Sequence, residues 1–424
     1  MAIRVFWLSS ANPLDTHLAK TGTWIPAMYN ALRERDEVDV CAVATFTTKK
    51  DFSVDRNSNT TSYFVPRSEI QCNGKPNSRI MAFIRKAIEE QKPDIIHVWG
   101  IENIWGVVIS SNEYNGYLKL VDIQGIRSVC STKFVTYAGL SDSEIRSMNK
   151  LRELMFPRFR IENKRKEDEA WSETERIILN NFSYISTQSE WVRAVLPQLV
   201  KNANIEKTGI VLRDGYMKSE QWHIRHQYKD KPVIFTIANV PRKGLHVTLK
   251  AVAIIKEKYP NVELRVAGMT RPQQSFFKGG YGSYIRKMVS DLELETNVNF
   301  LGFIEEKTLI ENLYQSDVFI ISSFIETYSL ALAEALALGV PSVAAYSSAL
   351  PELVENGETG FLYPVGDEYM CAYQVLKLLG DKELSERISL NASTWYRKEK
   401  SVESAANQQI NIYKKIMAER GNLL

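Results

Sequence analysis

The sequence predicts an α/β protein with two domains, each built on a parallel sheet. Short apolar runs rich in β-branched and aromatic residues alternate with segments of helical periodicity along the chain. Such alternation is typical of β-α-β units and therefore of parallel sheets. A chain of 424 residues is longer than one hydrophobic core usually serves. Its 44% apolar and 24% charged residues are ordinary for a globular protein.

The predicted strands fall into two groups along the chain. The first half contains IRVFWL, VDVCAVATF, DIIHVWG, LKLVDI and YISTQ, and the second half contains VIFTIA, VELRVAG, VNFLGF, VFIISS and PSVAAY. A polar segment, 213–231, separates the groups and breaks the alternation, so we expect an interdomain linker there. The predicted domains are residues 1–212 and residues 232–395. Residues 396–424 include a stretch with apolar residues at helical spacing.

Composition and patterning exclude several classes of protein. The four cysteines are far apart and form no C-x-x-C pair, which indicates reduced thiols and neither a disulfide framework nor a zinc site. The opening MAIRVFWLSSANP has only a brief apolar run, which predicts a first strand and not a signal peptide. No stretch approaches the roughly 20 apolar residues of a transmembrane helix. A net charge of +3 gives no support for nucleic-acid binding. We therefore expect a cytoplasmic protein whose contact with a membrane is peripheral.

The segment 318–339 carries the most functional information. An apolar strand is followed by Glu326, and Glu334 comes after seven intervening residues, inside a predicted helix that Ser329 can cap. The free amides at a helix start attract phosphate oxygens. Two nearby carboxylates suit the hydroxyl groups of a sugar and a ribose. The combination predicts a nucleotide-sugar site.

This spacing resembles the E-x7-E motif of the family-4 retaining glycosyltransferases. The resemblance continues downstream in LPELVENGETGFLYPVGD, and upstream in NVNFLGFIEEKTLIENLYQSDVFIISS and VIFTIANVPRKGLHVTLKAVAIIKEKYPNVELRVAG. It implies the GT-B fold, in which two Rossmann-like domains face each other across a cleft and ligands bind at the carboxyl ends of the strands. In that fold a terminal helix crosses back to the first domain, which we expect of residues 396–424.

By this resemblance, Lys243 of the K-G turn would neutralise the leaving diphosphate and Glu326 would contact the donor sugar. These two are the predicted catalytic residues. Glu334 would bind the ribose diol, and the backbone at Gly302 would touch the base. The full predicted donor-binding set is Arg242, Gly302, Tyr328, Ser329, Leu330 and Glu334, with the amides of 328–330 holding the phosphates.

On the acceptor side, the resemblance points to a glycine loop and to two strand ends. Gly22 lies in the loop, Glu102 ends the W-G-x-E motif, and Gln124 and Gly125 belong to an I-Q-G motif. Some bacterial surface-polysaccharide members of the family carry these two motifs together, whereas many relatives have a histidine in place of Gln124. Glutamine cannot exchange a proton near neutral pH, so a mechanism that relies on a protein base here is weakened.

The chain departs from the family pattern at other positions as well. Ala238 stands where an arginine is usual, and Arg242 is a candidate to replace it. The pair Ser348-Ala349 stands where many members have two glycines. The run GGYG at 279–282 lacks the spacing of a dinucleotide fingerprint, and we expect a flexible surface loop there.

No metal or other cofactor is expected. The chain has no D-x-D triplet, the motif that holds a cation on the diphosphate in glycosyltransferases of the other major fold. Lys243 and a helix start are available to stabilise the leaving group instead.

The segment Arg146–Lys166 is basic and has apolar residues between its charges. This pattern suits an anionic membrane surface or a lipid diphosphate acceptor, and it also suits a solvated helix face packed on the domain.

Together these features predict a retaining, metal-independent glycosyltransferase. It would move a sugar from a nucleotide-sugar donor to a saccharide acceptor, expected to be lipid-linked, in bacterial surface polysaccharide synthesis. Two alternatives stay open: a GT-B nucleotide-sugar epimerase, and a degenerate nucleotide-sugar-binding subunit, which Ala238 and Gln124 would favour. The base, the sugar, the acceptor and the linkage are also open.

Overall fold

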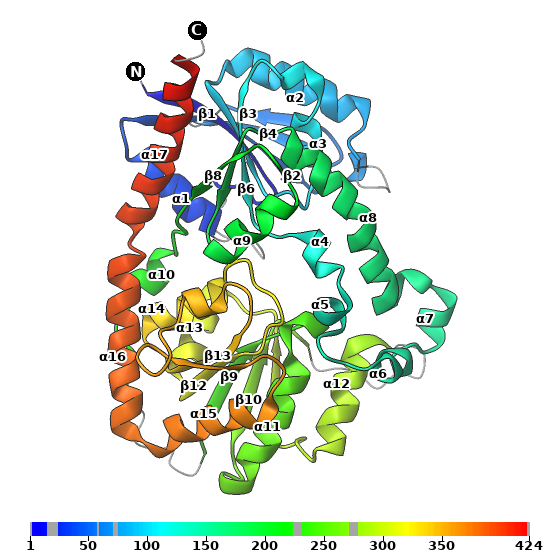
Figure 1. Ribbon diagram of the computed structural model, residues 1–424, viewed down its shortest axis with the longest axis vertical. Coiled ribbons are helices and arrows are strands. Elements are labelled where there is room, and N and C mark those ends of the chain that lie inside the picture. Colours follow the sequence, from blue (N-terminus) through cyan, green and yellow to red (C-terminus); the bar gives the residue numbers. More distant parts are fainter. Residues whose placement is uncertain are drawn as a thin grey trace. The chain divides into compact units, whose positions relative to one another are not determined.

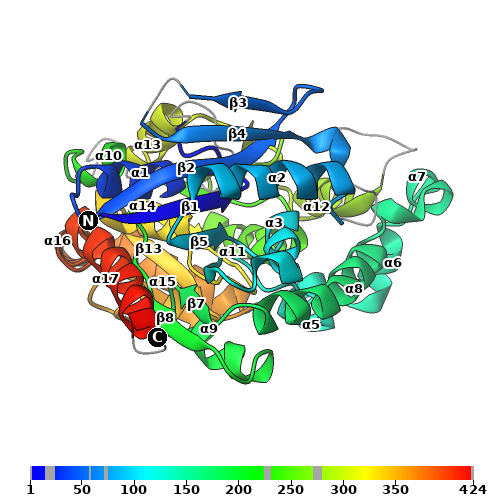
Figure 2. The same ribbon diagram turned by 90° about the horizontal axis from the view of Figure 1, so that it is seen from above.

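The computed structural model describes residues 2–14, 24–56, 59–70, 75–223, 231–270 and 279–421 (Figures 1 and 2). The chain forms two compact units. The first comprises Met1–Arg127, Trp171–Arg213 and Lys400–Leu424, and the second comprises Ser128–Ala170 and Asp214–Glu399. Each unit has a predominantly parallel sheet with helices, which confirms the predicted α/β class with two Rossmann-like domains.

The sheet of the first unit has the strand order β3-β4-β2-β1-β5-β6-β7-β8. All neighbouring strands are parallel except β3, which runs antiparallel to β4. The order turns back between β1 and β5, which is the switch point at which such sheets bind ligands. The strands are β1 (Ile3–Ser9), β2 (Val38–Thr47), β3 (Ser53–Asp55), β4 (Thr61–Pro66), β5 (Ile95–Trp99), β6 (Leu118–Ile123), β7 (Tyr184–Thr187) and β8 (Asn204–Lys207). The helices include α1 (Trp24–Arg33), α2 (Ser78–Gln91), α3 (Ile104–Ile109), α9 (Glu190–Val195) and α17 (Val402–Gly421).

The helix α17 contributes to the core of the first unit. It packs against α1, and the buried hydroxyl of Tyr413 accepts a hydrogen bond from Nε1 of Trp7 at 3.1 Å. The same hydroxyl lies 2.7 Å from Nδ1 of His97. Burial lowers the pKa of His97 well below its ordinary value, so its imidazole is neutral.

The sheet of the second unit is wholly parallel, in the order β11-β10-β9-β12-β13-β14. Its order turns back between β9 and β12, so the carboxyl ends of these two strands mark the expected ligand site. The strands are β9 (Val233–Ile237), β10 (Glu263–Ala267), β11 (Val298–Gly302), β12 (Val318–Ile321), β13 (Ser342–Tyr346) and β14 (Phe361–Pro364). The helices include α10 (Asp214–Met217), α11 (Leu245–Lys258), α12 (Gly280–Asp291), α13 (Glu306–Tyr314), α14 (Leu330–Leu338), α15 (Glu368–Gly380) and α16 (Lys382–Glu399).

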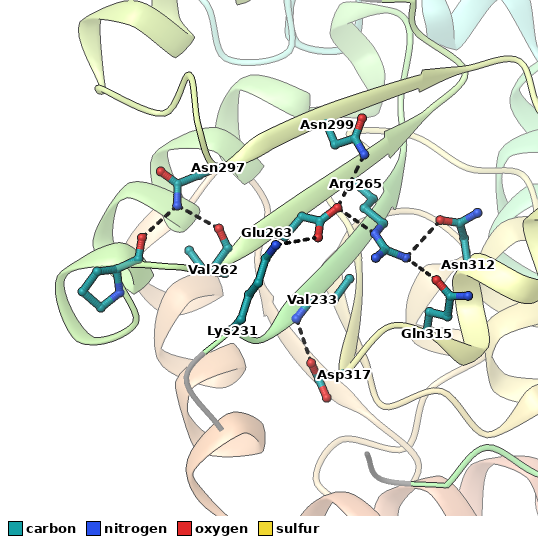
Figure 3. A network of polar contacts seen from close by, with 11 residues as sticks. Lys231, Val233, Val262, Glu263, Arg265, Asn297, Asn299, Asn312, Gln315 and Asp317 are labelled. Carbon is teal, nitrogen blue, oxygen red and sulfur yellow. Dashed lines mark hydrogen bonds and ion pairs between the residues drawn. The ribbon is translucent and has the colours of Figure 1, made fainter. Parts of the chain in front are cut away.

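A polar network holds α13 against this sheet (Figure 3). Arg265 of β10 donates to Glu263 on its own strand at 2.9 Å and to Gln315, just past the end of α13, at 2.8 Å. At the start of β9, the amide of Val233 donates to the carboxylate of Asp317 at 2.7 Å. Arg265 thus links β10 to the end of α13, and Asp317, which directly precedes β12, links that strand to β9.

Residues 128–170, which the sequence pattern assigns to a domain 1–212, pack with the second unit. They include α5 (Lys133–Tyr137), α6 (Asp142–Ser147), α7 (Leu151–Met155) and the first half of α8 (Ile161–Asn180). Long-range bonds secure them: the hydroxyl of Tyr284 donates to Glu144 at 2.6 Å, and the amide of Gly279 donates to Glu153 at 2.9 Å. Part of the predicted linker 213–231 is also packed, since Trp222 is buried and donates to the carbonyl of Ser316.

The GGYG run is not a surface loop, so that prediction is wrong. Gly280 is the first residue of α12, and its amide donates to the carbonyl of Met148 at 2.7 Å. A Cβ at Gly279 would lie 2.0 Å from that same carbonyl oxygen. The glycines are needed because the backbone of segment 128–170 approaches the start of α12 this closely.

None of the helices in the described parts of the chain combines the length and hydropathy needed to span a bilayer.

Candidate functional site

The K-G turn lies at the carboxyl end of β9, between that strand and α11. The 3₁₀ turn η6 (Pro241–Lys243) is followed by Gly244, whose φ of 69° is left-handed. A Cβ at Gly244 would lie 2.1 Å from the carbonyl oxygen of Ser322, so this position accepts glycine only. The carbonyl of Arg242 accepts the amide of Phe324 at 2.8 Å, which binds the turn to the segment after β12.

This arrangement brings together the two predicted catalytic residues, Lys243 and Glu326. Nζ of Lys243 lies 2.6 Å from Oε1 of Glu326, and the hydroxyl of Ser323 donates to the same oxygen at 2.6 Å. The lysine side chain is 32% exposed and the glutamate 11%. The ammonium is therefore held close to the switch point but stays accessible to a ligand.

The pair Ser348-Ala349 fixes the backbone of Glu326. The amide of Glu326 donates to the hydroxyl of Ser348 at 2.7 Å, and its carbonyl accepts the amide of Ala349 at 3.1 Å. Ser348 has a φ of 43°, in the left-handed region that favours glycine. The serine thus keeps a strained backbone like that of the usual glycine, and its hydroxyl positions the glutamate.

The helix α14 starts immediately after this loop. Ser329 is its N-cap residue, and its hydroxyl accepts the amide of Leu332 at 3.4 Å. Leu330 is the first helical residue, and the hydroxyl of Tyr328 is 2.8 Å from that of Tyr396. Amides in the first turn of a helix have no intrahelical acceptors and carry the positive end of the helix dipole. Residues 328–330 therefore lie at the positive end of this helix.

Glu334 lies in the second turn of α14 and is 5% exposed. Burial raises the pKa of Tyr396, and Tyr328 and the carboxylate of Glu334 raise it further. Gly302 ends β11 with a φ of 70°, and its amide and carbonyl bond to Met269 and Gly268 at 3.0 and 2.7 Å. The positive φ explains the glycine at this position.

In the first unit, the W-G-x-E and I-Q-G motifs meet around one carboxylate. A Cβ at Gly100 would lie 2.5 Å from Oε2 of Glu102, and a Cβ at Gly125 would lie 2.8 Å from Oε1. The two glycines therefore make room for the Glu102 side chain. Gln124 directly follows β6, so the structure brings Glu102, Gln124 and Gly125 together. Gly22 lies outside the described residues.

One further carboxylate, Asp122, has no role in the predicted site and is fully buried at the end of β6. Its side chain accepts the hydroxyl of Ser186 at 2.8 Å and the amide nitrogen of Gln188 at 2.6 Å, both after or on β7. Burial raises the pKa of Asp122 to about 8 and the pKa of Glu102 to about 7. A carboxylate at the end of a predicted parallel strand was the available signal for this residue.

A separate hollow of about 630 Å³ lies in the second unit. Its walls include Tyr284 and Arg286 of α12, Phe300 of β11, and Met148 and Lys150. None of the predicted site residues lines it, so we do not associate it with the pair at the switch point. In the described residues, no three His, Cys, Asp or Glu side chains are grouped so as to hold a metal ion.

Comparison with known proteins finds a family match that lies within the second unit. Residues 218–395 match the family described as glycosyl transferases group 1. The chain is 32% identical over 138 residues to N-acetyl-alpha-D-glucosaminyl L-malate synthase of Bacillus anthracis, covering 32% of this chain and 36% of the relative. It is 29% identical over 143 residues to the amylovoran biosynthesis glycosyltransferase AmsK of Erwinia amylovora, covering 32% and 33%. These matches thus span about a third of each relative.

Solved structures show that the whole chain has the two-domain GT-B fold. Sucrose-phosphate synthase from Thermosynechococcus elongatus aligns with a TM-score of 0.72 at 18% identity, covering 98% of this chain and 100% of that one. HepE from Anabaena, solved in complex with UDP-glucose, aligns with a TM-score of 0.59 at 17% identity, covering 100% of both chains.

Proposed function

We propose that this chain, which contains a glycosyltransferase group 1 domain, is a retaining glycosyltransferase that uses a nucleotide-sugar donor and a saccharide acceptor. The observation that carries the proposal is the Lys243–Glu326 pair at 2.6 Å. It lies at the carboxyl end of β9, directly before the start of α14, where a phosphate and a sugar can be bound side by side. The solved complex of HepE with UDP-glucose supports a donor of this class.

In this proposal, the second unit binds the donor. Glu334 accepts the ribose hydroxyls, the amides of residues 328–330 bind the phosphates, and Gly302 lets the backbone approach the base. Arg242 adds positive charge at the turn. Glu326 accepts hydroxyls of the donor sugar, and Lys243 then turns from Glu326 towards the diphosphate.

The reaction breaks the bond between the sugar and the diphosphate oxygen, and that oxygen keeps the electron pair. The acceptor hydroxyl forms the new bond on the same face of the sugar, and its proton passes to the departing phosphate. Negative charge grows on the diphosphate during this step, so a fixed ammonium stabilises the transition state more than the ground state. We propose that Lys243 provides this stabilisation without a metal ion.

On the acceptor side, we propose that Glu102, Gln124, Gly125 and the loop containing Gly22 bind the acceptor saccharide. Because the leaving phosphate takes the proton, Gln124 needs only to donate or accept a hydrogen bond. The names of AmsK and of the colanic acid glycosyltransferases WcaL, which are also similar to this chain, support a role in polysaccharide synthesis.

We further propose a lipid-linked acceptor and peripheral binding of a cytoplasmic protein to an anionic membrane through Arg146–Lys166. Within that segment, Leu154 and Met155 of α7 are each 58% exposed beside the exposed Arg158. Large apolar side chains left in water among basic ones suit the interface of an anionic bilayer.

A two-stage experiment tests the proposed function. A thermal-shift screen with UDP-, GDP-, ADP- and dTDP-sugars identifies the donor, and transfer to a lipid-linked saccharide is then measured with that donor. Stabilisation by a nucleotide-sugar, followed by transfer with retained anomeric configuration, is expected. Inversion, or turnover of the donor with no acceptor present, would overturn the proposal.

A further inference from the structure

An aromatic column leads away from the Lys243–Glu326 pair. The rings of His246 and Phe324 are stacked, with centroids 6.0 Å apart and planes 19° apart. The ring of Phe134 meets Phe324 edge-on, with centroids 5.5 Å apart. Phe324 precedes Glu326 by two residues and His246 follows Lys243 by three, so the column begins beside the pair.

The outer ring of the column comes from segment 128–170, which packs with the second unit. Phe134 belongs to α5, which packs directly against the turn η6. After α5 the chain passes Gly139, where a Cβ would lie 3.3 Å from the ring of Phe324. This close approach sets α5 against the loop that carries Glu326.

His246 fixes the end of α5 through a defined tautomer. Its Nε2 donates to the carbonyl of Ala138 at 2.9 Å, and its Nδ1 lies 2.9 Å from the hydroxyl of Tyr281 and accepts from it. The bond that Nδ1 accepts needs a neutral imidazole, and burial lowers the pKa of His246 to about 4. His246 therefore does not change its charge near neutral pH.

Exposure changes sharply along the column. His246 and Phe324 are buried, whereas Phe134 is 56% exposed. A single exposed aromatic residue is ordinary on a protein surface. Here, however, the exposed ring rests on a buried stack whose two residues lie within three positions of Glu326 and Lys243 in the chain. Apolar and aromatic walls with a few placed polar groups are the usual composition of a small-molecule site.

We propose that Phe134 is a platform for the sugar ring of the donor, an inference that rests on the proposed function. A pyranose has faces lined with C–H groups and a rim of hydroxyls, so a flat apolar ring can cover a face while Glu326 accepts from the rim. The nucleotide is held elsewhere, at Glu334 and Gly302. Phe134 therefore contributes to binding of the sugar and selects for its shape, and it leaves binding of the nucleotide unchanged.

The test compares each nucleoside diphosphate with its glucose derivative. Calorimetry with UDP, GDP, ADP and dTDP, and with the matching glucose compounds, gives the ratio of dissociation constants for wild type, Phe134→Ser and Phe134→Tyr. Phe156→Ser is the matched control, because Phe156 is another exposed phenylalanine of segment 128–170.

Phe134→Ser is expected to weaken the nucleotide-sugar about three- to tenfold, the value of one aromatic contact, and to leave the free nucleotide unchanged. Phe134→Tyr keeps the ring and should keep the affinity, as should Phe156→Ser. Equal affinity of wild type and Phe134→Ser for the nucleotide-sugar would overturn the inference, as would an equal loss for the free nucleotide. Wild-type protein that binds none of the four glucose compounds would instead count against the proposed function.

Discussion

Nζ of Lys243 lies 2.6 Å from Oε1 of Glu326, so the two residues proposed for catalysis neutralise each other when no ligand is bound. In the proposed function, a diphosphate competes with Glu326 for the ammonium, and a sugar hydroxyl can then donate to the carboxylate that is released. The hydroxyl of Ser323 donates to the same carboxylate oxygen at 2.6 Å and can hold Glu326 in place during this exchange. The pair therefore sets the ligand-free charge of the site close to zero.

Replacing Lys243 should depress turnover more than donor binding. In Lys243→Ala, we expect kcat to fall about a hundredfold or more, because stabilisation of growing charge is worth about 10²–10³ in rate. The dissociation constant of the donor should change much less. Lys250→Ala is the matched control, since Lys250 is on α11 and pairs with Glu368.

A chelator tests the proposal that no metal ion takes part in the reaction. Activity of the wild type should survive EDTA. Loss of activity with EDTA and recovery with magnesium would show that a cation, and not Lys243 alone, stabilises the leaving group.

Removing the charge of Glu334 should weaken binding of free nucleotide and nucleotide-sugar alike. Glu334→Gln keeps the shape of this buried side chain, and each hydrogen bond to a charged group is worth about 1.5–3 kcal/mol. Calorimetry with both ligands measures the loss. Glu311→Gln, on the exposed part of α13, should bind as wild type does. Unchanged affinity for both ligands would exclude Glu334 from the site.

The stability of the protein should fall as the pH rises towards 8. Burial raises the pKa of Glu102 from 4.5 to about 7 and that of Asp122 from 3.8 to about 8; Glu175 raises the pKa of Glu102 further, and Arg127 lowers it. In this window the unfolded chain has released protons that the folded protein still holds, so the free energy of unfolding decreases with pH. A tenfold difference in proton affinity between the folded and unfolded states corresponds to about 1.4 kcal/mol.

Thermal unfolding between pH 5 and pH 8 measures this slope. The variant with Glu102→Gln and Asp122→Asn should lose less stability than wild type over that range. Parallel curves for the two proteins would mean that neither carboxyl is protonated in the folded state.

Gly244→Ala should lower the free energy of unfolding more than Gly357→Ala does. Gly357 has a φ of 85° and open space at its Cβ, whereas Gly244 has a φ of 69° and the carbonyl of Ser322 at 2.1 Å. Gly357→Ala should cost about 1–2 kcal/mol, the penalty of a left-handed non-glycine residue. Gly244→Ala should cost that and a further steric penalty, measured by denaturant unfolding. Equal costs would mean that the chain relaxes around the added methyl group.

Binding to anionic membranes is best tested through the exposed apolar residues of α7. Lys164 and Arg165 form ion pairs with Asp168 and Glu169, so part of the positive charge of Arg146–Lys166 is already compensated. Leu154→Ser with Met155→Ser should reduce sedimentation with anionic liposomes, and high salt should reduce it for wild type.

Ile177→Ser is the control for this prediction, because Ile177 is 53% exposed but lies outside the segment. Equal sedimentation of wild type and the α7 variant would leave the segment as a solvated surface.

The local elements of the site could be predicted because their signals are local. The apolar strand, the loop with Glu326 and the capped helix with Glu334 follow one another within a few residues, and the glycines at 244 and 302 sit where the backbone needs a positive φ. The position of residues 128–170 could not be predicted. It depends on bonds from Tyr284 and Gly279 to carboxylates more than a hundred residues earlier, and no local pattern encodes such partners.

The incorrect loop at 279–282 has the same origin. Glycines read locally indicate flexibility, whereas here they make room for the carbonyl of Met148. Of the carboxyls Glu102 and Asp122 in the first unit, Glu102 was predicted as a site residue and Asp122 was not, for a similar reason. Glu102 belongs to a motif, but the pKa of Asp122 is raised by burial and by the nearby Glu102, against the lowering effect of the hydrogen bonds from Ser186 and Gln188.

The bond between Trp7 and Tyr413 joins residues 406 positions apart in the chain. A ribosome therefore releases β1 long before it makes the helix that completes the hydrophobic core around it. Chains usually fold from the N-terminus as they are synthesised. Until α17 has been made, Trp7 and His97 lack the hydroxyl of Tyr413 that both contact in the folded protein. The second unit can close earlier, because Ser128–Ala170 and Asp214–Glu399 are complete before α17 is translated. The unit that begins to be made first is thus the unit whose chain is completed last.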